Sequence, residues 1–270
     1  SQLYRQVASA HGAEALAEIL LDRAVQTRLK QEGIELNTED IDAERDKLLV
    51  SMDSDPDQAA RLLRQMREQR GLDDNGFKAL LRRNAGLRAI VRDQVTINEV
   101  AIKQAYDLRY GKKYQVRLIV TEDLDSVVIA RRKVVAGDSF TDLAIKLSTD
   151  SSARQGGLLS PISSVDSTYP KAIRDALPKL KMDTVGSRLS QVIALDQGYA
   201  ILWLESVLSP NDPPKLEQVR DDLASVTRSE LERVRMRQLA RTLIEQSDVV
   251  VLDPALDEAW RRQRGAIQNP

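Results

Sequence analysis

Few residues of this chain have the types and spacing that catalysis or metal binding requires. Its 270 residues include no Cys and a single His, His11. The lack of Cys excludes disulfides, thiolate metal sites and cysteine nucleophiles. One His excludes a His-rich metal site and a paired-His acid–base site, and its place beside Gly12 indicates a surface or helix-boundary residue. No phosphate loop, dinucleotide fingerprint, metal-ligand spacing or Ser/His/Asp arrangement is present, so we predict no cofactor and no metal.

Charge and hydropathy argue against a nucleic-acid partner and against a transmembrane helix. The formal net charge is −1, with Lys and Arg interleaved among Asp and Glu. Such a balance creates no overall field that favours nucleic acid, and the basic runs at 112–113 and 131–133 are too short to argue for it. We therefore predict no nucleic-acid partner. No apolar run approaches the length of a transmembrane helix.

The elements that could position a site are clearest at residues 114–205, where short strands, turn glycines and compact helices alternate. Residues 196–198, Asp-Gln-Gly, are a hairpin signal between two of the strands. From the apolar patterns we expect strands at 114–121, 158–162, 190–195 and 199–205, and helices at 124–135, 140–147 and 169–177. This pattern predicts an α+β domain.

Long amphipathic helices surround that central stretch. On the N-terminal side we expect helices over 1–32 (ended by Gly33), 37–52, 58–69, 77–91, and from a capping box of Thr96 and Glu99 onward. After the Pro-rich linker 209–214, one or two helices of roughly 30 residues, about 45 Å, follow. A helix of that length must pack on the N-terminal helices or on another subunit. A short strand at 249–252 and a last helix with Trp260 complete the expectation.

The central stretch resembles the parvulin family of peptidyl-prolyl isomerases. The order of an apolar first strand, G-x-x-F-x-x-L-A, a Ser-x-Asp segment ending in Gly-Gly, and a last strand opening with Gly-aromatic is the family's order. The matching residues are Gly137, Phe140, Leu143, Ala144, Ser148, Asp150, Ala153, Gly156, Gly157, Gly198 and Tyr199. Residues 33–34, 38–42, 71–82 and 95–100 are similar to the SurA/PrsA class of extracytoplasmic foldases.

The resemblance implies a fold and a domain division. We expect an α+β protein in which a mostly helical, chaperone-like domain is formed by N- and C-terminal segments. A parvulin-like domain with a four-stranded antiparallel sheet is inserted between them. The boundaries expected are 1–112 for the N-terminal helical part, 113–208 for the parvulin-like domain, and 209–270 for C-terminal helices that pack back on the first part.

The resemblance also implies site residues. Parvulins hold the proline ring in an apolar pocket above a hydrogen-bonded floor of a Cys or Asp and two strand histidines. Carried over by position, the acidic residue is Asp150, the first histidine falls on Arg117 and the second on Ala200. The pocket falls on Tyr169 and Ile173, with Leu118, Leu159 and Ala200 as further substrate-binding positions.

Both family histidines are therefore replaced, which leaves three functional hypotheses. An Asp150–Arg117 ion pair could replace the lost network, but Ala200 offers no hydrogen bond, so the first hypothesis is a folding factor whose isomerase site is degenerate. The second is an active prolyl isomerase. For Asp150, the alternative to a role in the site is that its side chain caps a turn. The third is a non-catalytic scaffold that dimerises through its helices.

The expected partners are unfolded or proline-containing polypeptides, with a homodimer through the helical domain as one alternative. The foldase resemblance implies an exported protein, in the periplasm or at a membrane surface. The chain begins at Ser1-Gln2 without Met, so the expectation is that a signal segment lies outside these 270 residues.

Overall fold

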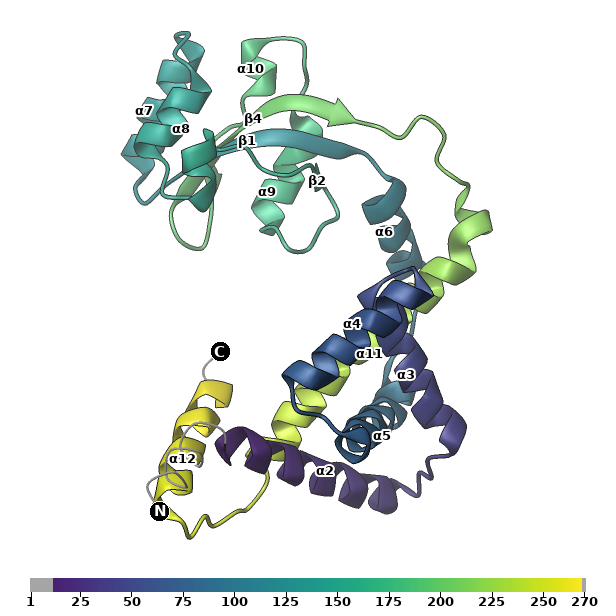
Figure 1. The fold of residues 1–270 in the computed structure, drawn as a ribbon. Helices are drawn as coiled ribbons and strands as arrows, with labels where there is room; N and C mark the ends of the chain where they lie inside the picture. The colour runs from purple at the N-terminus through teal and green to yellow at the C-terminus, as the bar shows by residue number, and fades with distance from the viewer. Residues whose placement is uncertain (1–11, 269–270) are drawn as a thin grey trace. The chain divides into compact units, whose positions relative to one another are not determined.

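The structure, a computed structural model, describes residues 12–268, so His11 lies outside the described residues. The chain divides into two compact units, one formed by residues 1–96 with 228–270 and the other by residues 97–227. We call them the helical unit and the sheet unit, and Figure 1 shows the elements of both. The domain boundaries expected at 112/113 and 208/209 stay a prediction, because compactness alone does not show where an independently folding piece ends.

The helical unit consists of helices whose ends follow local sequence signals. Gly33 ends the first of them in a left-handed conformation (φ +67°), as predicted. Asn37 caps the second, and Asp40 completes a capping box with it. The helices are α2 (Ala13–Glu32), α3 (Thr38–Met52), α4 (Pro56–Gln69), α5 (Asp74–Val91), η2 (Arg92–Gln94), the C-terminal part of α11 (Leu216–Glu245) and α12 (Pro254–Gln268).

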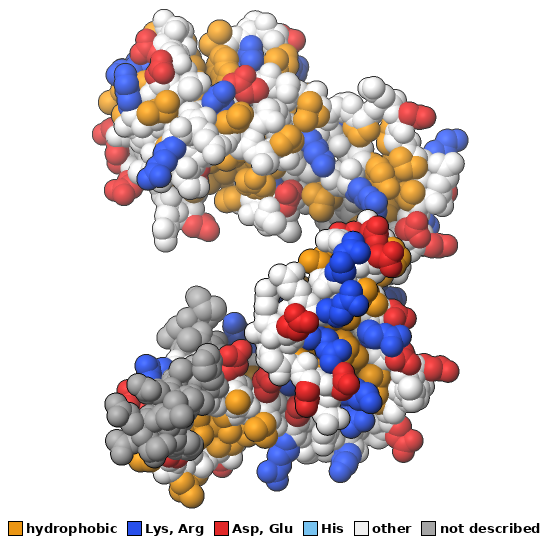
Figure 2. Space-filling view, in the orientation of Figure 1, with side chains coloured by type: hydrophobic (Ala, Val, Ile, Leu, Met, Phe, Trp, Pro, Cys, Tyr) orange, Lys and Arg blue, Asp and Glu red, His pale blue; other side chains and the backbone are white. Residues whose placement is uncertain are grey.

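Two hydrophobic clusters form the core of the helical unit. One joins α2, α5 and α11 through residues such as Val25, Leu87 and Met236. The other joins α2 to α12, where Trp260 is buried against Ala17. The long helix is a single helix of 30 residues, and it packs on the N-terminal helices, the first of the two predicted alternatives. Outside these clusters, Lys and Arg alternate with Asp and Glu over the visible helix faces (Figure 2).

The sheet unit contains one four-stranded antiparallel sheet in the order β2-β1-β4-β3, which confirms the predicted fold class. The central pair runs in register from Lys113↔Leu208 to Thr121↔Tyr199. The elements are α6 (Glu99–Tyr110), β1 (Lys113–Thr121), α7 (Leu124–Val135), α8 (Phe140–Leu147), η3 (Ser151–Gln155), β2 (Ile162–Ser163), α9 (Lys171–Ala176), η4 (Leu177–Lys179), α10 (Val185–Arg188), β3 (Ile193–Ala194) and β4 (Tyr199–Leu208).

The two faces of the sheet carry separate cores because side chains alternate along a strand. Leu118 of β1 belongs to a cluster with Ile173 of α9 and Ala200 of β4. Its neighbour Ile119 belongs to a second cluster with Phe140 of α8 and residues of α7. Figure 1 shows α7 and α8 beside each other at one end of the strands, and α9 below β1. Even-numbered residues of β1 such as Leu118 therefore pack in the first cluster, and Ile119 packs in the second.

Four local predictions are wrong or too long. Asn98, not Thr96, caps α6, since its side chain accepts a hydrogen bond from the Ala101 amide at 2.9 Å. The run at 249–252 forms no strand in the described chain: Val250 and Leu252 are 81% and 89% exposed, and no neighbouring strand supplies ladder hydrogen bonds. The strands expected at 158–162 and 190–195 shrink to β2 and β3, of two residues each. Within residues 12–268, every helix is too short or too polar to span a bilayer.

Candidate functional site

The five apolar residues expected to bind a peptide come together on one face of the sheet. Leu118 of β1, Ile173 of α9 and Ala200 of β4 are buried in a common cluster. Leu159 and Tyr169 pack against that cluster and are half-buried. Leu159 and Tyr169 are therefore the partly exposed members of this group, and the other three residues are buried beneath the surface.

The Gly-Gly turn delivers Leu159 to this face. Gly157 has φ +75°, and a Cβ there would lie 2.3 Å from the Leu118 carbonyl oxygen, so only glycine fits. The close approach allows the Leu118 amide to donate to the Gly157 carbonyl at 2.7 Å and the Leu159 amide to donate to the Val116 carbonyl at 3.0 Å. These two hydrogen bonds fix the segment after the turn alongside β1.

Asp150 caps η3. Its Oδ1 accepts hydrogen bonds from the Ser152 amide at 2.8 Å and from the Ser152 hydroxyl at 2.5 Å, as an N-cap carboxylate does. The preceding Thr149 amide donates to the Val120 carbonyl at 2.9 Å, and Val120 is in register with Ala200. The carboxylate thus lies next to the β1 end of the apolar face, with one oxygen already engaged.

Arg117 does not pair with Asp150. Its Nε lies 2.5 Å from Glu205 Oε1, and its Nη1 donates to the carbonyls of Gln155 and Gly156 at 3.1 and 3.0 Å. The expectation of an Asp150–Arg117 pair is therefore wrong. Arg117 instead ties β4 to the end of η3, because it points to the opposite face of β1 from Leu118.

A β-bulge explains why Glu205 is the partner. The register shifts so that Gln115 opposes Ser206 while Val116 opposes Leu204, which leaves Glu205 opposite no residue. A bulge re-aims the extra side chain and increases the local twist. The sequence analysis missed Glu205. Arg117 lies directly opposite Trp203, so Glu205 is at the diagonal position two residues further along β4, where opposite charges can pair across strands.

Comparison with known proteins shows what this chain is similar to. No family model matches the chain. Foldase protein PrsA 1 of Lactiplantibacillus plantarum is 32% identical over 138 residues, which are 50% of this chain and 45% of that protein. Foldase protein PrsA of Levilactobacillus brevis is 25% identical over 142 residues, 50% of this chain and 46% of that protein. The matched part spans about half the length of these curated relatives.

The fold agrees with a solved structure over most of the chain. The crystal structure of peptidylprolyl isomerase (PrsA) from Bacillus anthracis aligns with a TM-score of 0.51 and 19% identity, and the alignment covers 88% of this chain and all of that one. The chain is a PrsA-like protein with a parvulin-type domain. The recognition drawn from the spaced motifs is thereby confirmed.

The PrsA-like chain has no histidine on its sheet. At the position of the second family histidine, the apolar face has Ala200. Ala200 is fully buried, and its methyl group neither donates nor accepts a hydrogen bond. Asp150, the acidic residue assigned to the site by resemblance, caps the η3 turn. Within residues 12–268, no group of three or more metal-ligating side chains is placed to hold a metal ion. The face is thus formed by apolar side chains, and Asp150 is engaged in the η3 turn beside it.

Proposed function

We propose that this PrsA-like protein is an extracytoplasmic folding factor that binds unfolded or newly exported polypeptides. The sheet unit binds peptide without isomerising it at a useful rate. The relatives named as foldases support the first part of the proposal. The absence of any hydrogen-bonding group at Ala200 supports the second, and this is the observation on which the proposal rests.

The physical argument concerns the barrier to amide rotation. That barrier is about 18–20 kcal/mol and arises from resonance in the peptide bond. An enzyme lowers it only by interactions that are stronger in the twisted transition state than in the planar ground state. An apolar base formed by Leu118, Ile173 and Ala200 contacts the proline ring equally in both states, and so contributes binding without rate acceleration.

Exchange spectroscopy by NMR tests the proposal. A short Xaa-Pro peptide is mixed with the full chain, and the cis/trans exchange rate and the line width are both measured. We expect broadened lines from binding and an exchange rate within about twofold of the free peptide. Acceleration of tenfold or more, lost in Asp150→Ala, would overturn the degenerate-site proposal in favour of an active isomerase.

Matched variants separate the site from the fold. Tyr169→Ala removes a half-buried wall of the face and should abolish the broadening. Asp123→Ala removes a helix cap of the same chemistry at α7, where the Asp123 side chain accepts from the Ser126 amide, and should leave the broadening unchanged. A parallel assay measures suppression of aggregation of a chemically unfolded protein. A chain that neither broadens the peptide lines nor suppresses aggregation would favour the scaffold hypothesis instead.

A further inference from the structure

The helical unit contains a cavity of about 410 Å³ between α2, α3, α5 and α11. Its volume is in the range of sites that hold a small ligand or a few side chains. The floor is apolar and is formed by Leu21, Leu48, Leu87, Met236 and Ala240. The cavity lies in the helical unit, whereas the apolar face described above belongs to the sheet unit.

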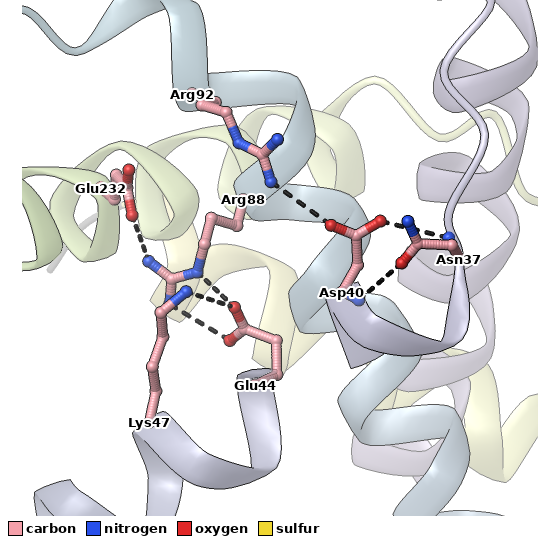
Figure 3. A network of polar contacts seen from close by, with 7 residues as sticks. All are labelled: Asn37, Asp40, Glu44, Lys47, Arg88, Arg92 and Glu232. Carbon is pink, nitrogen blue, oxygen red and sulfur yellow. Dashed lines mark hydrogen bonds and ion pairs between the residues drawn. The ribbon is translucent and has the colours of Figure 1, made fainter. Parts of the chain in front are cut away.

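A buried ion network, drawn in Figure 3, contributes Glu44, Lys47 and Arg88 to the lining of this cavity. Arg88 of α5 donates to Glu44 of α3 and to Glu232 of α11, and all three residues are buried. Lys47 lies 3.6 Å from the same Glu44. Two cations therefore face two carboxylates, and the network is neutral. Burial opposes the charge of Arg88, but its hydrogen bonds and ion pairs with Glu44 and Glu232 outweigh burial and raise its pKa above the ordinary value.

The next cation on the wall is also neutralised from within the unit. Arg83 of α5 lines the cavity and lies 3.0 Å from Asp22 and 3.8 Å from Glu18, both on α2. Its side chain is nearly buried between them. The carboxylates near the cavity are thus already engaged by Arg88, Lys47 and Arg83.

Two arginines of α11 remain. Arg233 and Arg237 lie one helical turn apart, are exposed, and both line the cavity. Neither takes part in an ion pair among the described residues. The lining of the cavity therefore includes apolar side chains, members of a neutral ion network, and two exposed arginines that form no ion pair among the described residues.

We infer that this cavity binds acidic–apolar segments of client polypeptides. An apolar side chain of an extended segment enters over Leu87 and Met236, and a neighbouring Asp or Glu pairs with Arg233 and Arg237. Guanidinium groups suit this role because their planar forks match a carboxylate. The inference rests on the proposed polypeptide-binding function and adds a sequence preference to it.

Fluorescence anisotropy with three labelled peptides tests the preference. The peptides share the same Leu and Phe positions and carry Asp, Ser or Lys at the neighbouring positions, and each is titrated with the full chain. We expect the Asp peptide to bind about tenfold tighter than the Lys peptide, since a charge-assisted pair is worth about that factor. Added salt should narrow the difference, because the arginines are exposed.

Paired variants locate the effect. Arg233→Glu with Arg237→Glu should reverse the order of the Asp and Lys peptides. Arg235→Glu with Arg241→Glu changes the same charge on the same helix at exposed positions that do not line the cavity, and should keep the order. Ala240→Phe fills the floor and should weaken all three peptides alike. Circular dichroism establishes that each variant retains its helices.

The outcomes separate the inference from the function on which it rests. If the three peptides bind equally, or if both double variants act alike, the cavity does not select acidic segments, while polypeptide binding as such stands. If no peptide binds and the chain does not suppress aggregation of an unfolded protein, polypeptide binding itself fails. Reversal by the first double variant alone would establish the site.

Discussion

Arg88 of α5 and Glu232 of α11 are 144 positions apart in the sequence, yet Nη1 of Arg88 lies 2.5 Å from Oε2 of Glu232 in the interior of the helical unit. Glu44 of α3 pairs with the other edge of the same guanidinium. One buried cation thus joins three helices from three distant segments. Arg88 and Glu44 also line the cavity of the helical unit.

Removing the cation should destabilise the helical unit strongly. Arg88→Met leaves Glu44 and Glu232 buried without a counter-charge, and we expect a loss of about 3–5 kcal/mol. Urea denaturation followed by fluorescence of Trp260, which is buried in this unit, measures the loss in a Trp203→Phe background. As a control, Arg92→Met removes a solvent-exposed pair with Asp40 at 3.5 Å and should cost less than about 1 kcal/mol. A loss of similar size in both variants would contradict the central role of Arg88.

Substitution by alanine should change the stability of the sheet unit in opposite directions at Gly157 and at Gly186. Gly157→Ala forces a side chain into a left-handed backbone and against the Leu118 carbonyl, and we expect a loss of at least about 2 kcal/mol. Gly186→Ala lies in α10 with no atom within 4 Å of the new Cβ and should be neutral or stabilise by about 0.4–1 kcal/mol. Urea denaturation followed by Trp203 fluorescence gives the midpoint of each variant. Equal midpoints for Gly157→Ala and Gly186→Ala would contradict the prediction.

Restoring a histidine at the second family position should cost stability without restoring catalysis. Ala200 is fully buried in the apolar cluster, so Ala200→His overfills it and buries an imidazole without a partner, a loss of about 3 kcal/mol. Val207→His on the same strand is at an exposed position and should change stability by less than about 0.5 kcal/mol. Denaturation and the cis/trans exchange rate are both measured. An Ala200→His chain that is stable and accelerates exchange would show that only this side chain was missing.

One part of the acid sensitivity of the sheet unit should come from Asp123. A hydrogen bond from the Ser126 backbone amide is the main reason why the pKa of Asp123 is lowered from 3.8. The ionised carboxylate therefore stabilises α7 above that pH, and the contribution is lost as the pH falls below 3.8 through the lowered pKa. Asp123→Asn keeps an N-cap acceptor but does not titrate. Thermal midpoints from about pH 6 to about pH 2.5 should fall less steeply for Asp123→Asn, and parallel curves would contradict the assignment.

Local signals predicted much of the sheet unit. The apolar run of β1, the cap of η3 at Asp150, the Gly-Gly turn and the hairpin before β4 each depend on residues close together in the chain. The family resemblance assigned Leu118 and Ala200 to one site, and side-chain parity along the paired strands explains why both lie in one cluster. These features follow from backbone preferences and from the two-residue period of a strand.

The sequence by itself determined the order of elements, the family resemblance and the replacement of both family histidines. Tertiary structure decided the partners of the charged residues. Arg117 binds Glu205 because a bulge redirects β4, and the run at 249–252 stays irregular because no strand lies beside it in the described chain. Ion pairs such as Arg88–Glu232 join segments that helix packing alone brings together. A side chain's period fixes the face on which it lies, but the long-range fold fixes what it meets there.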